Sequence, residues 1–356
     1  MWLFKSSIGR KFIMAVTGLC LVLFVTFHVL MNSVALIWPT AYNSICEFLG
    51  ANWYALVASM GLAALFIIHI LYAVWLTLQN RAARGSDRYA VTSRPPQVEW
   101  SSKNMLVLGI VIVAFLAVHL IQFWAKMQWV ELRGADISQM PEVAGAPAGP
   151  VQGTMMLQLA FSCIWTPIIY IIGFIALWFH MTHGFWSMFQ TVGWDNKIWL
   201  SRLKSISCWW TTIVVLLFVA QAVVFSVQAH RNFFIENVEL QEQYSEYWNE
   251  EAKALNEEFM APIEAAQAKV MQAQMAQADL NAYQAAMNAA NEEINAHVAE
   301  NGQAFIDAAA LIEKAYSVQC SKMPMTQDIM QMKGIVRNVQ SSLPQNEAII
   351  NQPIKH

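Results

Sequence analysis

Five long apolar runs without a charged residue occupy the first two thirds of this chain. They lie at about 12–38, 53–78, 105–123, 156–189 and 208–227. Each is close to or longer than the roughly 20 residues that an α-helix needs to cross about 30 Å of hydrocarbon. A bilayer core offers no water to pair with backbone polar groups, so only helices and closed barrels can span it. The sequence therefore predicts an all-α bundle of five transmembrane helices.

The distribution of charge divides the chain near residue 231. Residues 1–231 carry 14 Lys and Arg against 7 Asp and Glu, a net charge of about +7. Residues 232–356 carry 7 basic and 17 acidic residues, a net charge of about −10. We predict a membrane domain at 1–231 and an acidic extension at 232–356 that lies outside the membrane, because anionic headgroups repel it.

The extension is rich in Ala, Gln, Asn and Met. Strong helix formers run from about 240 to 259, and again from Pro262, a residue suited to the start of a helix, toward Tyr316. Gly302 is a potential interruption of the second helix. We expect the two helices to form an antiparallel hairpin or a small bundle. The alternative is a solvated, partly disordered tail.

Basic residues predict the orientation of the spans. Eleven of them lie at the amino end, in the loop between spans two and three, and in the loop between spans four and five. These are Lys5, Arg10, Lys11, Arg81, Arg84, Arg88, Arg94, Lys103, Lys197, Arg202 and Lys204. The opposite side has only Lys126, Arg133 and Arg231. The positive-inside rule therefore places the amino terminus in the cytoplasm and the extension on the periplasmic or external side.

Each of the first four spans contains one histidine at membrane depth, namely His28, His69, His119 and His180. Ionisable residues inside a membrane are costly, which favours a functional role. At about 1.5 Å per residue, His28 and His119 lie roughly 22–25 Å from the cytoplasmic face, and His69 and His180 roughly 15 Å. Two histidines at each of two depths predict two six-coordinate b haems, each with histidine axial ligands to its iron.

Other interpretations of the histidines and cysteines are weaker. A single histidine in a span often forms hydrogen bonds between helices, but four on four helices at matched depths are harder to explain in that way. His183 follows His180 by three residues at the cytoplasmic edge, and we interpret it as an interface residue or a neighbour of a haem propionate. The five cysteines are scattered without a CxxC or CxxCH motif, which argues against iron–sulfur ligation, a zinc site and covalently attached haem.

Several segments around these histidines resemble a known family. They are SSIGRKFIMAVTG (6–18), FHVLMN (27–32), HILYAVW (69–75), AVHLIQFW (117–124) and FHMTHGFWSMFQTVGW (179–194). Over residues 1–230 the chain resembles the cytochrome b membrane-anchor subunit of single-anchor, di-haem succinate:quinone oxidoreductases and quinol:fumarate reductases. The acidic extension is not part of that family pattern.

The resemblance implies a role in electron transfer. His28 with His119, and His69 with His180, would be the ligands of two b haems in a bacterial inner membrane. A flavoprotein and an iron–sulfur protein would dock on the cytoplasmic side, and a membrane quinone, menaquinone or ubiquinone, would exchange electrons with them through the haems. The chain has no dinucleotide fingerprint or P-loop. It would therefore be the subunit of the enzyme that does not bind dicarboxylate.

Two rival functions remain open at this point. One is a cytochrome b of the hydrogenase or formate dehydrogenase type. The cytochrome bc type is disfavoured because it takes two ligands from each of two helices. The other rival is a transporter or a non-haem scaffold that presents the acidic extension to a partner. None of these readings involves nucleic acid, and an oligomer of the complex is compatible with all of them.

A quinone site requires a group able to pass protons close to a haem. Glu47 is the only carboxylate in the loop between spans one and two, where Tyr42 and Asn43 also lie. We predict that Glu47 serves a quinone site on the outer side. The alternatives are that Glu47 is a solvated loop residue, or that quinone binds near His183 and Trp186 on the cytoplasmic face.

Overall fold

A computed structural model describes residues 6–50, 52–84, 99–194, 196–276 and 279–343. Lys5, Arg88 and Arg94, which contribute to the predicted orientation, lie outside these ranges. The chain forms two compact units. The first consists of residues 1–135 and 150–234, and the second of residues 136–149 and 235–356.

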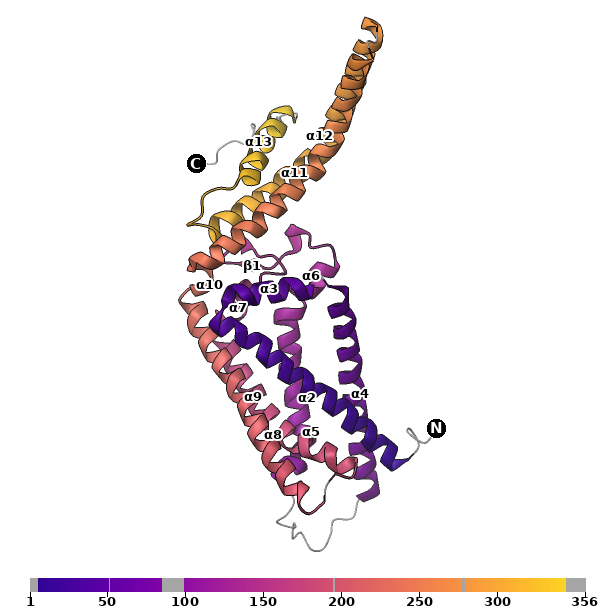
Figure 1. Cartoon of the computed structure of the whole chain (residues 1–356), viewed down its shortest axis with the longest axis vertical. Coiled ribbons are helices and arrows are strands. Elements are labelled where there is room, and N and C mark those ends of the chain that lie inside the picture. The colour runs from indigo at the N-terminus through magenta and orange to yellow at the C-terminus, as the bar shows by residue number, and fades with distance from the viewer. Residues whose placement is uncertain (1–5, 51, 85–98, 195, 277–278, 344–356) are drawn as a thin grey trace, which may run out of the picture. The chain divides into compact units, whose positions relative to one another are not determined.

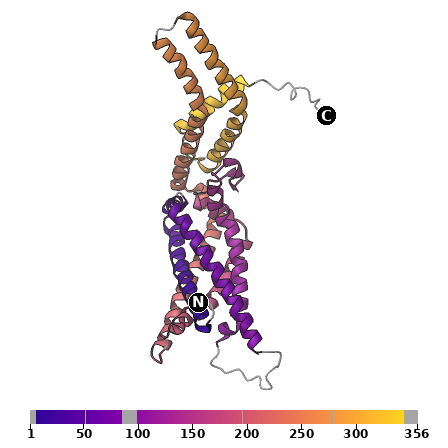
Figure 2. The same cartoon turned by 90° about the vertical axis from the view of Figure 1, so that its right-hand side faces the viewer.

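Five helices of the first unit are long and apolar enough to cross a membrane, which confirms the predicted number among the described residues. In Figures 1 and 2 they run alongside one another as a bundle. They are α2 (Ser7–Ile37), α4 (Trp53–Arg84), α5 (Trp100–His119, continued by the π-helix η1, Leu120–Trp124), α8 (Trp165–Thr191) and α9 (Trp199–His230). The chain is therefore compatible with a multi-pass membrane protein.

Three short helices lie together at one end of this bundle: α3 (Pro39–Gly50), α6 (Gln128–Leu132) and α7 (Gly153–Phe161). The prediction of one continuous span over 156–189 is wrong, because α7 ends at Phe161 and α8 begins at Trp165. Pro167 explains the break. Proline has no N–H to continue the hydrogen bonds of a preceding helix, but it is tolerated in the first turn of a new one.

Packing in the first unit is tightest between α8 and its neighbours. Phe174 of α8 stacks on Phe218 of α9 with 5.1 Å between ring centroids. A Cβ atom at Gly173 would lie 2.5 Å from Cγ of Phe115, so glycine is needed for the close approach of α5. By contrast, none of the residues in the most apolar stretch of α4 is buried within the protein. Much of α4 is thus left to contacts with lipid or other molecules.

The second unit is built on a helical hairpin of α11 (Val238–Met275) and α12 (Leu280–Gln319), against which α13 (Gln327–Ser342) packs (Figures 1 and 2). As residue numbers increase along α11, the numbers of their partners on α12 decrease. Trp248 donates to Gln319 (2.8 Å), Phe259 stacks on Phe305 (4.3 Å), and Lys269 pairs with Glu293 (2.7 Å). The hairpin is therefore antiparallel, as predicted.

The predicted helix boundaries within the hairpin are wrong. Pro262 does not start a helix but lies inside α11. The turn comes later, where Asp279 caps α12 by accepting from the backbone N–H of Ala282 at 2.8 Å. Gly302 does not interrupt α12. A Cβ atom there would lie 2.8 Å from Val339 of α13, so this glycine allows two helices to approach closely.

A small hairpin from the loop between spans three and four belongs to the second unit. It contains the 3-10 helix η2 (Ile137–Gln139), β1 (Glu142–Val143) and β2 (Ala146–Pro147). Ala144 and Gly145 form its turn with φ of 52° and 79°, as a two-residue hairpin loop requires. The Gln319 side chain donates to the carbonyl of Pro147 at 2.6 Å. This loop and the extension therefore fold together as one unit.

Candidate functional site

The predicted histidine ligands meet as two pairs of rings, each contributed by two different spans. His28 on α2 and His119 at the end of α5 have ring centroids 5.7 Å apart and ring planes at 88°. His69 on α4 and His180 on α8 have centroids 6.3 Å apart at 62°. These are the two pairs that the depth argument and the family resemblance suggested.

The separations suit two imidazoles on opposite sides of one metal ion. A metal–imidazole bond is about 2.0–2.1 Å and the ring centroid lies about 1 Å beyond the nitrogen, which gives roughly 6 Å between centroids. The described residues contain no group of three or more His, Cys, Asp or Glu side chains that could hold a metal ion. The site is thus a two-histidine arrangement, and its haem ligation stays a prediction.

Tyr170 orients His119. The Tyr170 hydroxyl donates to Oε1 of Gln122 at 2.9 Å and lies 3.2 Å from Nδ1 of His119. Because its hydrogen is used by Gln122, the hydroxyl accepts from His119 Nδ1–H. The other ring nitrogen, Nε2, then keeps its lone pair for a metal. Metal-bound histidines usually have such a partner on the second nitrogen.

Thr17 does the same for His69. Its hydroxyl donates to the carbonyl of Ile13 at 2.9 Å and lies 3.1 Å from Nδ1 of His69. The hydroxyl therefore accepts from the imidazole N–H, and Nε2 of His69 is left unprotonated. Gly18, the next residue of α2, lies against the same ring. A Cβ atom there would be 3.6 Å from Cε1 of His69, which is an ordinary van der Waals distance.

The remaining two histidines are less firmly held by the protein. Nδ1 of His180 is buried and has no hydrogen-bond partner among the described residues. The Asn32 amide lies 3.4 Å from both ring nitrogens of His28, which is long for a hydrogen bond. These two rings therefore lack the orienting hydrogen bond that Tyr170 and Thr17 give to His119 and His69. The two ring separations and the orientation of His119 and His69 are what fit a bis-histidine haem.

Aromatic side chains enclose the His28–His119 pair. His28 stacks on Phe24 and touches Phe218, and His119 lies between Phe115 and Phe123. The π-helix η1 begins directly after His119. Such wider turns often mark functional sites, and this one contains Gln122, which also donates to Thr166 at 3.1 Å. No pattern in the sequence indicates the π-helix or the role of Tyr170.

His183 lies outside both pairs and has a carboxylate partner. Its Nδ1 is 3.1 Å from Glu99 just before α5, and Lys204 on α9 lies 2.8 Å from the other oxygen of Glu99. Burial alone would raise the pKa of Glu99, but hydrogen bonds from Lys204 and His183 outweigh it and hold the pKa below its ordinary value. The carboxylate therefore stays ionised at neutral pH and becomes protonated only as the pH falls through the acidic range.

Glu99 joins the ends of three spans, and sequence reasoning did not identify it. The available signal was its position as the last carboxylate before the third apolar run. Lys204 also lies 4.4 Å above the ring of Trp186, which places Trp186 in the same cluster. His183 thus belongs to a cluster with Glu99, Lys204 and Trp186, and its function stays a prediction.

Glu47 differs in burial from Tyr42 and Asn43, the two residues predicted beside it. All three lie on α3 and not in a loop. Tyr42 and Asn43 are buried, where Tyr42 donates to Asn32 at 3.1 Å and Asn43 accepts from Thr154 at 2.8 Å. Glu47 is exposed, so its use by quinone stays a prediction.

A second carboxylate close to α3, Glu131 on α6, was missed by sequence reasoning. It is half-buried, and burial raises its pKa above the ordinary value. A Cβ atom at Gly50 would lie 2.5 Å from its Oε2, so α3 approaches it closely. Its signal in the sequence was weak, because it lies in an unremarkable polar loop.

Comparison with family models, curated proteins and solved structures finds no match for this chain.

Proposed function

We propose that this chain is the di-haem cytochrome b subunit that anchors a succinate:quinone oxidoreductase or quinol:fumarate reductase in the membrane. The observation that carries the proposal is the pairing of four intramembrane histidines, one per span, with ring centroids 5.7 and 6.3 Å apart. When bound, b haems with two histidine ligands each would supply one-electron carriers without an open site for oxygen.

The chain's own residues would hold and orient these groups. His28 and His119 would be the axial ligands of one haem, and His69 and His180 those of the other. Tyr170 and Thr17 select the ring tautomer that presents Nε2. The aromatic rings around the first pair keep water away, which lowers the local dielectric and strengthens every polar contact made there.

The proposed partners would meet the basic side of the bundle. Arg10, Arg81, Lys103, Arg202 and Lys204 lie at span ends that the positive-inside rule assigns to the cytoplasm. Complementary charge on a flavoprotein and an iron–sulfur subunit would steer their docking. Succinate or fumarate chemistry would take place on those partners, and this chain would exchange electrons with menaquinone or ubiquinone.

The direct test is the haem content of the purified chain. We expect a pyridine haemochrome assay to return two haems b per polypeptide, and a reduced-minus-oxidised spectrum to show low-spin b-type bands. One haem or none per chain would contradict the proposal. Copurification of an iron–sulfur subunit with a hydrogenase or formate dehydrogenase instead of the flavoprotein would preserve the haem site but overturn the choice of enzyme.

Glu47→Gln should slow quinol-linked turnover while both haems remain bound. General acid–base groups contribute about 10²–10⁴-fold to a rate, so a loss of at least about tenfold is expected. Glu131→Gln is the matched control because it neutralises another carboxylate close to α3. Steady-state turnover with a soluble quinol analogue measures both variants. Slowing by Glu131→Gln alone would move the site away from Glu47.

A further inference from the structure

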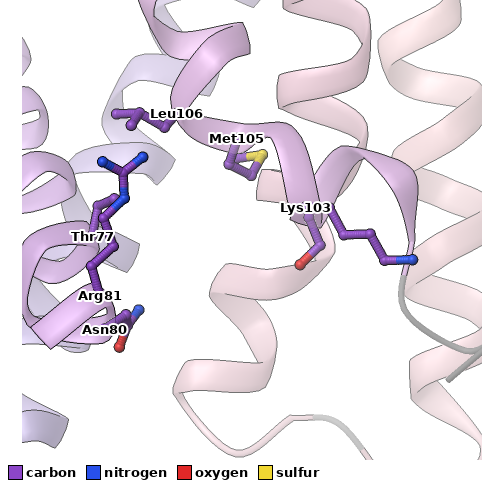
Figure 3. Close-up of a pocket in the computed structure, with 7 residues that line it drawn as sticks. Thr77, Asn80, Arg81, Lys103, Met105 and Leu106 are labelled. Carbon is purple, nitrogen blue, oxygen red and sulfur yellow. The ribbon is translucent and has the colours of Figure 1, made fainter. Parts of the chain in front are cut away.

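A pocket of about 560 Å³ lies between the end of α4 and the start of α5 (Figure 3). Its volume is within the range of about 300–1,000 Å³ that is typical of small-molecule sites. It is lined by Thr77, Asn80, Arg81, Ser102, Lys103, Met105 and Leu106. No part of the two histidine pairs lines it.

Among the residues that the structure describes, the pocket lining includes one guanidinium and no carboxylate. In Figure 3 the Arg81 side chain extends from α4 into the space between the two helices, whereas the Lys103 ammonium points away from that space. None of the seven lining residues is acidic, and Arg81 forms no ion pair with any carboxylate that the structure describes. A guanidinium that faces a cavity and has no carboxylate partner among the described residues favours an anionic ligand, and its planar fork matches phosphate oxygens.

The position along the helices indicates an amphiphile. Thr77 and Arg81 lie near the end of the apolar helix Trp53–Ala83, and Ser102 lies near the start of Trp100–Trp124. One turn further toward the middle of each span, Val74 and Ile110 are exposed apolar side chains. The polar end of the pocket is thus at the depth of lipid headgroups, and apolar surface continues from it into the bilayer.

We propose that this pocket binds an anionic phospholipid. Arg81 pairs with its phosphate, Ser102 contributes a hydroxyl, and the acyl chains lie along the exposed faces of α4 and α5. The absence of an acidic lining residue disfavours a zwitterionic headgroup, whose cation would have no partner among the described residues. Basic pockets between transmembrane helices are a known means of binding anionic headgroups. The inference does not depend on haem.

The test compares lipid retention by matched variants of the purified full chain. Native mass spectrometry would follow binding of phosphatidylglycerol and phosphatidylcholine in detergent. We expect Arg81→Gln to weaken phosphatidylglycerol binding at least tenfold. Arg202→Gln is the control, since Arg202 is another guanidinium at a span end but lies over the ring of Trp199 at 5.3 Å. It should bind this lipid as the unmodified chain does.

A second variant separates the pocket from general charge. Met105→Trp fills the cavity and leaves Arg81 in place, and it should also lose the lipid. Helix content by circular dichroism checks that each variant folds. Equal losses in Arg81→Gln and Arg202→Gln, equal binding of phosphatidylcholine, or displacement of the lipid by millimolar inorganic phosphate would each overturn the proposal. The last result would assign the pocket to free phosphate.

Discussion

Replacing His180 with alanine should remove one of two haems, whereas replacing His183 should remove neither. His180 faces His69 with ring centroids 6.3 Å apart. His183 lies one helical turn away and is bound to Glu99. The pyridine haemochrome assay should therefore fall from two haems per chain to one for His180→Ala and stay at two for His183→Ala.

The spectrum of the surviving haem gives an independent readout. In His180→Ala the remaining component should be the one held by His28 and His119, with the line shape of a low-spin, six-coordinate centre. His119→Ala should remove the complementary component, so that the two difference spectra add to that of the unmodified chain. Loss of a haem from His183→Ala with retention in His180→Ala would show that the wrong histidine has been assigned.

Replacing Trp248 with alanine should unfold the second unit and leave the first unit unchanged. Trp248 is fully buried between α11 and its neighbours, and its Nε1 donates to Gln319 at 2.8 Å. Removing a buried tryptophan side chain typically costs about 3–5 kcal/mol, and the buried side-chain oxygen Oε1 of Gln319 loses its donor. This is a large share of the roughly 5–15 kcal/mol that stabilises an ordinary domain.

Limited proteolysis and hydrogen exchange measure this effect directly. Faster cleavage and exchange are expected throughout α11, α12 and α13 in Trp248→Ala, with bound haem unchanged. Met275→Ala is the control, because Met275 is 77% exposed at the end of α11 and contributes little to the core. If Trp248→Ala and Met275→Ala had the same exchange rates, the folded hairpin would not be held together by this core.

The sequence alone determined the features that follow from the bilayer. The five long apolar runs predicted the number of helices long enough to cross a membrane, because each crossing needs about the same number of helical residues. Histidine depth along His28, His69, His119 and His180 then suggested two pairs, since residues at equal depth on neighbouring helices can meet. The antiparallel hairpin of the extension was also predictable, because strong helix formers fill almost the whole segment.

Tertiary packing decided what depth and composition do not encode. Pro262 continues α11 because Phe259 and Ile263 on either side of it are buried. Tyr170, Thr17 and Glu99 reach their histidine partners across 51, 52 and 84 residues of sequence. The loop hairpin at 136–149 joined the second unit through contacts such as Gln319 with Pro147. Each of these depends on side chains brought together only after the helices pack, so no local pattern could indicate them.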